Sequence, residues 1–384
     1  MLPRANSSPM RRLRGQARRH ARAHHFLPLR WLERAIMTLT WPAGALIDTI
    51  HHLRMMPEHP ENPASLLFLG GKMLALALLE NVPPVEYHYF RLHHPERSRM
   101  ACDYLYWNEL DLLHLLNIRN GANNQDVQDK GRFAEICRDH GFPCIPTLAV
   151  YQGGGQIFPE KPYLPHEPEL WVKDLAGSQR SGAGQWKLQE GFYLSSAGIR
   201  RTPEELTDSW KKRNCIVQPV LENHPDLECL SDGTLVDMRI VTGIDTNGEV
   251  HLITHNIILP WGGFANRPRS VLGKLDDSGR IVRTLYPDGR AIQCHPQTGA
   301  TFSDALVPFW REARELVLEA HRKAFPRFVF LGWDVAITAD GPILIETNSG
   351  PGFSLHQLLD DLPLGKTVFP SIASGYFEKD GKCA

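Results

Sequence analysis

Residues 328–352 read FVFLGWDVAITADGPILIETNSGPG, and this stretch predicts a β-hairpin that carries three oxygen donors. Two apolar runs flank Ala339-Asp340-Gly341, whose residue types favour a tight turn. Glu346 and Asn348 are two residues apart, so on a strand their side chains point to one face, and the paired strand can bring Asp334 alongside. These oxygens suit Mg²⁺, completed by phosphate oxygens and water. The alternative is that Asp and Asn are turn residues and Glu346 is a solvated strand end.

A lysine followed by a glycine-rich loop is the second candidate feature. Lys173 ends a short apolar run expected to form a strand over residues 170–173, and residues 177–184 read GSQRSGAG. Glycines let backbone N–H groups approach a phosphate closely, and the lysine adds a positive charge. The loop matches neither GxxxxGK[ST] nor a GxGxxG that enters a helix, so it does not indicate a P-loop or a dinucleotide site. A plain flexible loop is the alternative.

Two further cations fall on expected elements. Lys130 opens a helix expected over residues 130–140, although a surface lysine is the simpler interpretation. Arg239 lies within a hairpin expected over residues 234–259, with Thr246-Asn247-Gly248 supplying the turn. An arginine in the middle of a strand usually needs an anionic partner, which is either a phosphate or a structural salt bridge.

Several short motifs follow one another along the chain. They are Lys130 ahead of GFPCIP (141–146), Val172-Lys173 ahead of the glycine loop, IVQPVLENHP (216–225), Asp237-Met-Arg239, GWDVAIT (332–338), and Asp334 followed by Glu346-Thr-Asn348. In this order, the motifs resemble the ATP-grasp enzymes, among them D-alanine–D-alanine ligase, glutathione synthetase and the ribosomal-protein glutamate ligases. More narrowly, IVQPVLENHP and GWDVAIT are similar to the sugar-transfer-associated ATP-grasp group, described as related to glutamate ligases and linked to cell-surface polysaccharide synthesis. The resemblance covers about residues 117 to 370.

The resemblance implies a role for each matching residue. Two lysines are implied to contact the ATP phosphates, and Arg239 is implied to contact the γ-phosphate or an acyl-phosphate. Glu222 or Asp226 is implied as the ribose acid. The lysines are Lys130 and Lys173; the loop over the phosphates is Gly177, Ser178, Gly182 and Gly184; the adenine hinge is Gln218, Val220 and Leu221; the Mg²⁺ ligands are Asp334, Glu346 and Asn348; and Asn266, Arg267 and Arg269 are substrate-side candidates.

The implied fold is α+β, with two ATP-grasp subdomains that clamp ATP between antiparallel sheets. We expect a helical N-terminal region over residues 1–116, a lid over 117–220 and a C-terminal subdomain with the metal site over 221–384. Within the first region, residues 36–53, 65–79 and 104–116 have apolar spacing that favours helices.

The implied reaction is carbon–nitrogen ligation. A carboxylate attacks the γ-phosphate of ATP, and an amine displaces phosphate from the resulting acyl-phosphate. ATP and Mg²⁺, or Mn²⁺ in its place, are the expected cofactors, and a glycan precursor is a candidate substrate. A kinase on the same fold and a non-catalytic ATP-binding scaffold of a glycan-assembly complex are the alternatives. We find neither a Gly-x-Ser-x-Gly elbow nor a Cys/His pair that would suggest a nucleophile.

Charge and cysteine usage limit the other functions. The formal net charge of −1 argues against nucleic-acid binding by the whole chain. Seven scattered cysteines without a CxxC pair favour reduced thiols and a cytoplasmic location.

The first 32 residues hold eight arginines and no acid, which indicates either an arm drawn to anionic lipid at the inner membrane face or a disordered basic leader. The apolar run 64–79 is too short to span a bilayer, so we expect a buried helix there.

Overall fold

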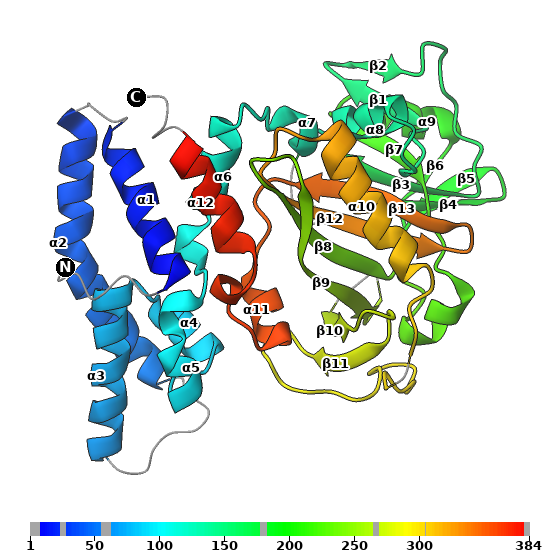
Figure 1. The fold of residues 1–384 in the computed structure, drawn as a ribbon. Helices are drawn as coiled ribbons and strands as arrows, with labels where there is room; N and C mark the ends of the chain where they lie inside the picture. Colours follow the sequence, from blue (N-terminus) through cyan, green and yellow to red (C-terminus); the bar gives the residue numbers. More distant parts are fainter. Residues whose placement is uncertain are drawn as a thin grey trace. The chain divides into compact units, whose positions relative to one another are not determined.

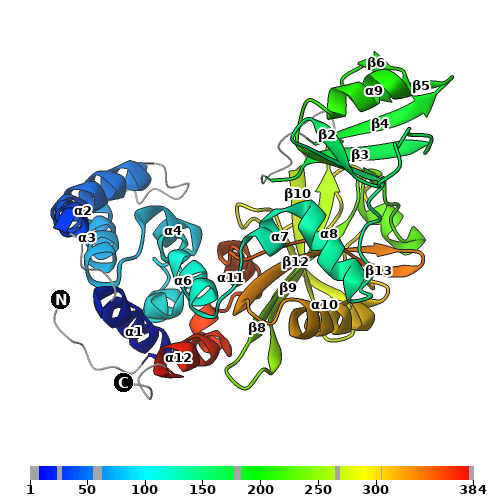
Figure 2. The same ribbon diagram turned by 90° about the horizontal axis from the view of Figure 1, so that it is seen from above.

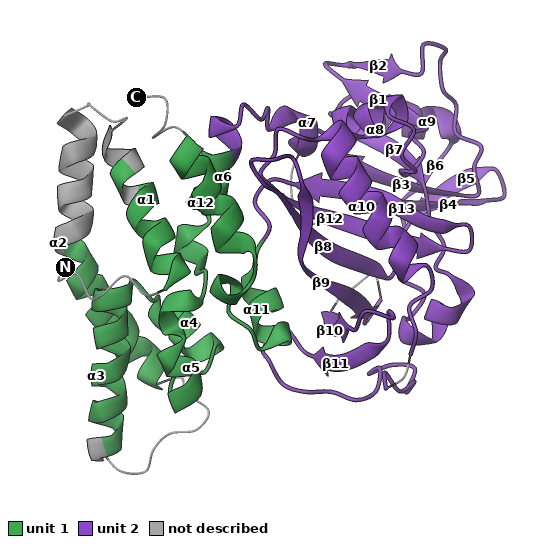
Figure 3. Ribbon diagram, in the orientation of Figure 1, with its two compact units in different colours: residues 1–116, 352–384 green, residues 117–351 purple. Residues whose placement is uncertain are grey.

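The computed structural model describes residues 8–23, 28–54, 63–176, 183–263, 269–303 and 305–379. The chain divides into two compact units, residues 1–116 with 352–384 and residues 117–351 (Figure 3). The last residues thus group with the N-terminal helices, whereas the expected C-terminal segment ran from 221 to 384. The predicted boundary at residue 220 stays a prediction.

The first unit is helical, as expected of the N-terminal region. In both views of the ribbon, α2 and α3 lie on the side of this unit away from α11 and α12 (Figures 1 and 2). The helices are α1 (Pro9–Ala23), α2 (Pro28–Arg54), α3 (Pro63–Glu80), α4 (Pro84–Tyr89), α5 (Pro95–Arg99), η1 (Ala101–Asp103), η2 (Trp107–Glu109), α6 (Asp111–Arg119, which crosses the unit boundary), α11 (Ser354–Asp360), η4 (Leu364–Lys366) and α12 (Phe369–Lys379).

The basic N-terminal stretch forms a packed helix over part of its length. In α1, Met10 and Leu13 are fully buried. Arg11 donates to Glu80 at 2.6 Å, and Arg14 donates to Glu109 at 2.6 Å. The expectation of a disordered leader is therefore wrong for Pro9–Ala23, because apolar burial and two ion pairs hold this helix.

Two other helix predictions need correction. The run 104–116 is not one helix: Tyr104 is extended, and a separate turn begins after Tyr106, whose backbone N–H donates to Glu109. The helix expected over 64–79 does form as α3, but it is not buried all round, because Leu67 is 78% exposed and Phe68 is 76% exposed. None of the described helices combines the length and apolar composition that crossing a bilayer requires.

The second unit contains two antiparallel sheets. The first, called the lid sheet below, has the strand order β2-β1-β7-β3-β4-β5-β6. Its helix α9 was not predicted, although Thr202 and Glu205 form the capping box that marks its start. The elements are α7 (Gln125–Gln128), α8 (Lys130–Asp139), β1 (Ala149–Gln152), β2 (Gly155–Phe158), β3 (Glu169–Asp174), β4 (Gly184–Gln189), β5 (Phe192–Ser195), β6 (Arg200–Arg201), α9 (Pro203–Trp210) and β7 (Cys215–Pro219).

The other sheet, called the large sheet below, has the order β11-β10-β9-β8-β12-β13. Both predicted hairpins form here, β8 with β9 and β12 with β13. The elements are η3 (Pro225–Leu230), β8 (Asp237–Ile244), β9 (Val250–Trp261), β10 (Arg269–Leu275), β11 (Ile281–Leu285), α10 (Trp310–Ala324), β12 (Phe330–Thr338) and β13 (Gly341–Asn348).

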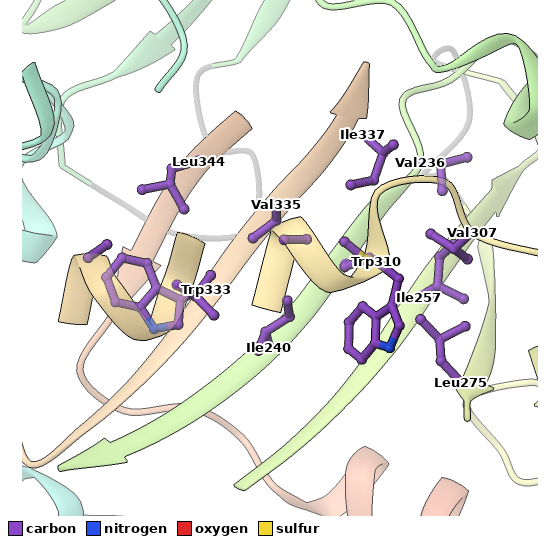
Figure 4. Packing of buried hydrophobic residues seen from close by; sticks show 14 of the residues in the cluster. Val236, Ile240, Ile257, Leu275, Val307, Trp310, Trp333, Val335, Ile337 and Leu344 are labelled. Carbon is purple, nitrogen blue, oxygen red and sulfur yellow. The ribbon is translucent and has the colours of Figure 1, made fainter. Parts of the chain in front are cut away.

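One face of the large sheet packs against α10 and α8 to make the main core. Alternate residues of β12 and β8, such as Trp333, Val335 and Ile240, point into it beside Trp310 of α10 (Figure 4). Since strand side chains alternate, the residues between these must point to the opposite face. The two antiparallel sheets with a helical N-terminal region confirm the predicted α+β class. Arg239 and the three candidate metal ligands belong to that opposite face.

Candidate active site

The candidate metal ligands lie on the face of β12 and β13 that points away from the core. Asp334 pairs directly with Glu346, and Gly332 pairs with Asn348. The register shifts by one residue immediately after Asp334. This β-bulge lets the rest of the hairpin keep its apolar residues in the core while the three oxygen-bearing side chains share the other face.

Asn348 uses space that only a glycine on the neighbouring strand leaves open. A Cβ atom on Gly332 would lie 3.1 Å from Asn348 Nδ2, 3.2 Å from its Oδ1 and 2.9 Å from Pro351 Cβ. The Asn348 amide therefore lies over the backbone of Gly332, two residues from Asp334 on the same face.

Arg239 lies directly opposite Asp334 on the other neighbouring strand, β8. Its Nη2 donates to Asp334 Oδ2 at 3.0 Å, and its Nε lies against Oδ1. Burial raises the pKa of Asp334 to about 8; Arg239 opposes this rise, and Asp237 and Glu346 add to it. Asp237, Asp334 and Glu346 thus gather near one arginine, and a cation bound beside Asp334 would favour its ionised form. The partner of Arg239 in this structure is Asp334, and its contact with a phosphate stays a prediction.

Asn256 extends this row onto β9, and the sequence analysis did not select it. It pairs with Arg239 and is buried. The available signal was a polar residue inside the apolar strand HLITHNIILPW. The row across four neighbouring strands is thus Glu346, Asp334, Arg239 and Asn256, which we call the polar row.

Lys173 brings the lid sheet to the polar row. It lies on β3, is 7% exposed, and its Nζ is 3.9 Å from Glu346 Oε2. Burial lowers the pKa of Lys173, as does Lys130, whereas Glu346 and Asp334 raise it. The lid sheet thus places a buried lysine directly beside the candidate metal ligands of the large sheet.

Lys130 is the first residue of α8, and the start of this helix lies beside the end of β3. Asp129 is the N-cap and accepts from the backbone N–H groups of Gly131 and Arg132. The backbone N–H of Lys130 donates to the carbonyl of Leu175 at 3.1 Å, two residues after Lys173. The helix start is therefore tied to the end of β3, which explains why the two lysines influence each other electrostatically.

The predicted hinge lies at the end of β7. Gln218 is buried one strand from Lys173, and its Oε1 has no hydrogen-bond partner among the described residues. Since a buried carbonyl without a partner is costly, a ligand that donates to Gln218 would stabilise this site. Val220 and Leu221 follow as half-buried residues outside regular structure, and Glu222 is exposed. Asp226, the alternative ribose acid, is also exposed.

Several predicted residues lie outside the described part of the chain. These are Gly177, Ser178 and Gly182 of the glycine loop, with Asn266 and Arg267 of the substrate-side segment. Of the two remaining candidates, Gly184 begins β4, and Arg269 begins β10 with its guanidinium 4.9 Å from the Trp261 ring centre. The polar row and the two lysines are therefore the part of the predicted site that the structure brings together.

The donor set fits a hard divalent cation. Asp334 and Glu346 provide carboxylate oxygens and Asn348 an amide oxygen, which are the ligand atoms that Mg²⁺ prefers. A second group, Asp245, Glu249 and His251, lies at the β8–β9 turn with its ligand atoms within 4.8 Å of one another. There Asp245 already accepts backbone N–H groups of the turn, so we assign that group to holding the hairpin.

Residues 110–368 match the family model described as sugar-transfer associated ATP-grasp. A search of curated protein sequences finds no match to the chain.

Solved structures similar to the chain include several ligases. The ATP-grasp ligase PsnB complexed with minimal precursor has 12% identity and a TM-score of 0.36, covering 66% of this chain and 60% of its own. D-alanine–D-alanine ligase from Bacillus anthracis complexed with ATP has 13% identity and a TM-score of 0.36, covering 67% and 68%. L-amino acid ligase from Bacillus licheniformis has 12% identity and a TM-score of 0.38, covering 76% and 62%. The chain thus spans about three fifths of the length of the first of these structures.

Proposed function

Because the chain belongs to the sugar-transfer associated ATP-grasp family, we propose that it is an ATP- and Mg²⁺-dependent ligase that joins a carboxylate to an amine. The observation that carries the proposal is the 3.9 Å approach of Lys173 Nζ to Glu346 Oε2. This approach joins a lysine of the lid sheet to the candidate metal ligands of the large sheet. ATP-grasp enzymes in general use ATP and Mg²⁺ between two such sheets.

ATP would lie between the two sheets. Lys130 and Lys173 would contact its phosphates, with residues 177–184 closing over them. The adenine would lie near Gln218, whose buried Oε1 can accept from an exocyclic amine. Val220 and Leu221 would offer backbone groups to the adenine edge, and Glu222 would approach the ribose.

Asp334, Glu346 and Asn348 would hold one or two Mg²⁺ ions, or Mn²⁺ in their place. Such an ion, when bound, neutralises charge on the transferring phosphoryl group. It would also replace the positive charge that Asp334 now draws from Arg239. Arg239 would then be free to turn toward the γ-phosphate and the acyl-phosphate.

The reaction would proceed in two balanced steps. A carboxylate oxygen bonds to the γ-phosphorus, the bond from that phosphorus to the bridging oxygen breaks, and ADP leaves. The amine nitrogen then bonds to the acyl carbon, phosphate leaves, and the nitrogen loses a proton. Positioning and charge neutralisation supply most of the catalysis in such phosphoryl transfers, which matches a site of cations and metal ligands without a nucleophile.

The carboxylate substrate would lie beyond Arg239 along the large sheet. Asn256 comes next in the polar row. On the following strand, β10, Gly273 pairs with Ile257, so the antiparallel register brings Lys274 opposite Asn256. Strands are about 4.8 Å apart, so Lys274 is roughly 10 Å from Arg239. This distance suits a small acid whose reacting carboxylate is at Arg239 and whose remaining polar groups face Asn256 and Lys274.

The family's link to cell-surface polysaccharides makes a glycan precursor or an amino-acid conjugate a candidate for one substrate. A cytoplasmic location, where ATP is available, belongs to the same proposal.

The test is a screen of acids and amines for Mg²⁺-dependent ADP release, with mass spectrometry of the products. The isosteric variants Asp334→Asn and Glu346→Gln should each lower turnover by about a hundredfold or more, because they remove negative charge at the metal. Glu249→Gln, an exposed carboxylate at the β8–β9 turn, is the matched control and should keep full turnover. Circular dichroism would show that all three variants fold.

Two results would overturn the proposal. A product that retains the phosphate would identify a kinase rather than a ligase. Turnover in Asp334→Asn and Glu346→Gln equal to that of the control would remove the metal assignment.

A further inference from the structure

Helix α3 presents an apolar stripe to solvent from Leu67 to Leu79. Leu67 is 78% exposed, Phe68 is 76% exposed and Leu79 is 58% exposed, while Met73 and Ala77 on the opposite side are buried. The stripe follows the 3.6-residue period of a helix and extends about 18 Å at 1.5 Å per residue. Its members, all apolar and exposed, are Leu67, Phe68, Gly71, Ala75, Leu78 and Leu79.

The neighbouring helix also exposes large apolar side chains. On α2, Leu46 is 46% exposed, Ile47 is 66% exposed and Ile50 is 44% exposed. The close packing of the two helices is visible at Gly70, where a Cβ would lie 2.8 Å from Leu53 Cδ1. Isolated exposed apolar residues are normal on proteins, but a periodic stripe of this length usually marks a binding surface.

The charges around α3 are positive or neutralised, except for Asp48, which is exposed on α2 beside Ile47. Within Pro63–Glu80 the only acid is Glu80, and Arg11 of α1 pairs with it at 2.6 Å. Arg12 and Arg19 of the same basic helix are exposed. Lys72 is half-buried beside the stripe. An apolar stripe next to a helix with surplus arginines is complementary to an anionic lipid surface.

We propose that the α3 stripe, together with the exposed arginines of α1, docks this protein on the surface of a membrane that contains anionic lipid. The stripe's side chains offer no hydrogen-bonding group, whereas protein interfaces carry about one hydrogen bond per 100–200 Å². Acyl chains require no hydrogen bonds, and the arginines meet the headgroups. This surface belongs to the helical unit and does not depend on the ATP site.

The experiment is sedimentation of the full chain with vesicles of phosphatidylcholine alone and with 30% phosphatidylglycerol, a composition chosen for the assay. The wild-type chain should sediment with the mixed vesicles and more weakly with phosphatidylcholine. In Leu67→Glu/Phe68→Glu, partitioning should fall by about tenfold or more, because two large apolar side chains no longer leave water. The matched control Ile157→Glu/Leu164→Glu adds the same charge at two exposed apolar positions of the lid segment and should bind as wild type does.

Each other outcome overturns the proposal. If the wild-type chain binds neither kind of vesicle, the proposal is wrong. Equal loss in both double variants would show that added negative charge alone repels the membrane. Unchanged binding of Leu67→Glu/Phe68→Glu would assign docking to the basic residues by themselves. A wild-type oligomer that this variant dissociates, without vesicle binding, would make α3 a contact between two copies. Circular dichroism melting checks that both variants fold, and ATP turnover provides a readout separate from docking.

Discussion

Replacing Gly332 by alanine should impair the proposed metal site by moving Asn348, which lies on the neighbouring strand. The new Cβ would lie 2.9 Å from Pro351 Cβ and 3.1 Å from Asn348 Nδ2, whereas ordinary contacts begin at 3.4 Å. The proline ring cannot rotate away, so the Asn348 amide and the strand end that carries it must move by about 0.3–0.5 Å. Overpacking of this kind costs on the order of 1–3 kcal/mol of stability.

The functional loss should exceed what this change in stability explains. Mg²⁺ demands near-ideal octahedral geometry, and a misplacement of 1 Å can cost about a hundredfold in rate. A shift of about half that size should lower Mg²⁺-dependent ADP release by roughly tenfold and raise the Mg²⁺ concentration needed for half-maximal turnover. Steady-state ADP release across a Mg²⁺ titration measures both quantities, at a temperature well below the melting point of the variant.

Gly155→Ala is the matched control, because a Cβ there meets no atom within 4 Å. It should keep the turnover and Mg²⁺ dependence of the wild type. If Gly332→Ala did the same, the Asn348 amide would not be a ligand, and the inference from its position over Gly332 would be refuted.

Three further predictions concern single side chains. Lys173→Met should weaken ATP binding by tenfold or more in a calorimetric titration, since a buried phosphate contact contributes about 1.5–3 kcal/mol; unchanged affinity would contradict its assignment. Lys274→Ala should raise KM for the acid substrate and leave KM for ATP unchanged, and an equal effect on both would show a structural role. Burial lowers the pKa of His321 to about 4 in the folded chain, so the unfolded chain binds a proton on this residue at a higher pH. As the pH falls from 6.5 to 4, the free energy of unfolding should therefore fall by about 3 kcal/mol. Denaturant titrations should show this loss in the wild type and a flatter profile in His321→Gln.

The hydrogen bonds explain why His321 resists protonation. Its Nε2 lies 2.7 Å from the Phe328 carbonyl, which can only accept, so Nε2 carries the proton. Its Nδ1 therefore accepts from the Thr242 hydroxyl at 2.7 Å, and that hydroxyl accepts from Trp333 Nε1 at 2.8 Å. A second proton on the ring would break this chain in the core.

Much of the fold could be predicted because its signals are local. Asn247-Gly248 and Asp340-Gly341 mark the two hairpin turns, and the alternation of apolar residues around Trp333 identifies the core face. The errors arose where local signals compete with packing. The apolar composition of 64–79 predicted burial, but composition alone does not show which face of a helix is covered, and the structure leaves Leu67 and Phe68 exposed.

The sequence by itself determined which side chains share a face of each strand, because side chains two residues apart on a strand point the same way. Only the tertiary structure decided what lies beside them. A bulge between Val241 and Thr242 shifts the β8–β9 register by one residue and puts Asn256, rather than its neighbour, opposite Arg239. The approach of Lys173 to Glu346 depends on how two sheets from distant parts of the chain face each other. Register shifts and sheet packing are set by the side chains of many elements together, so no single stretch of sequence contains them.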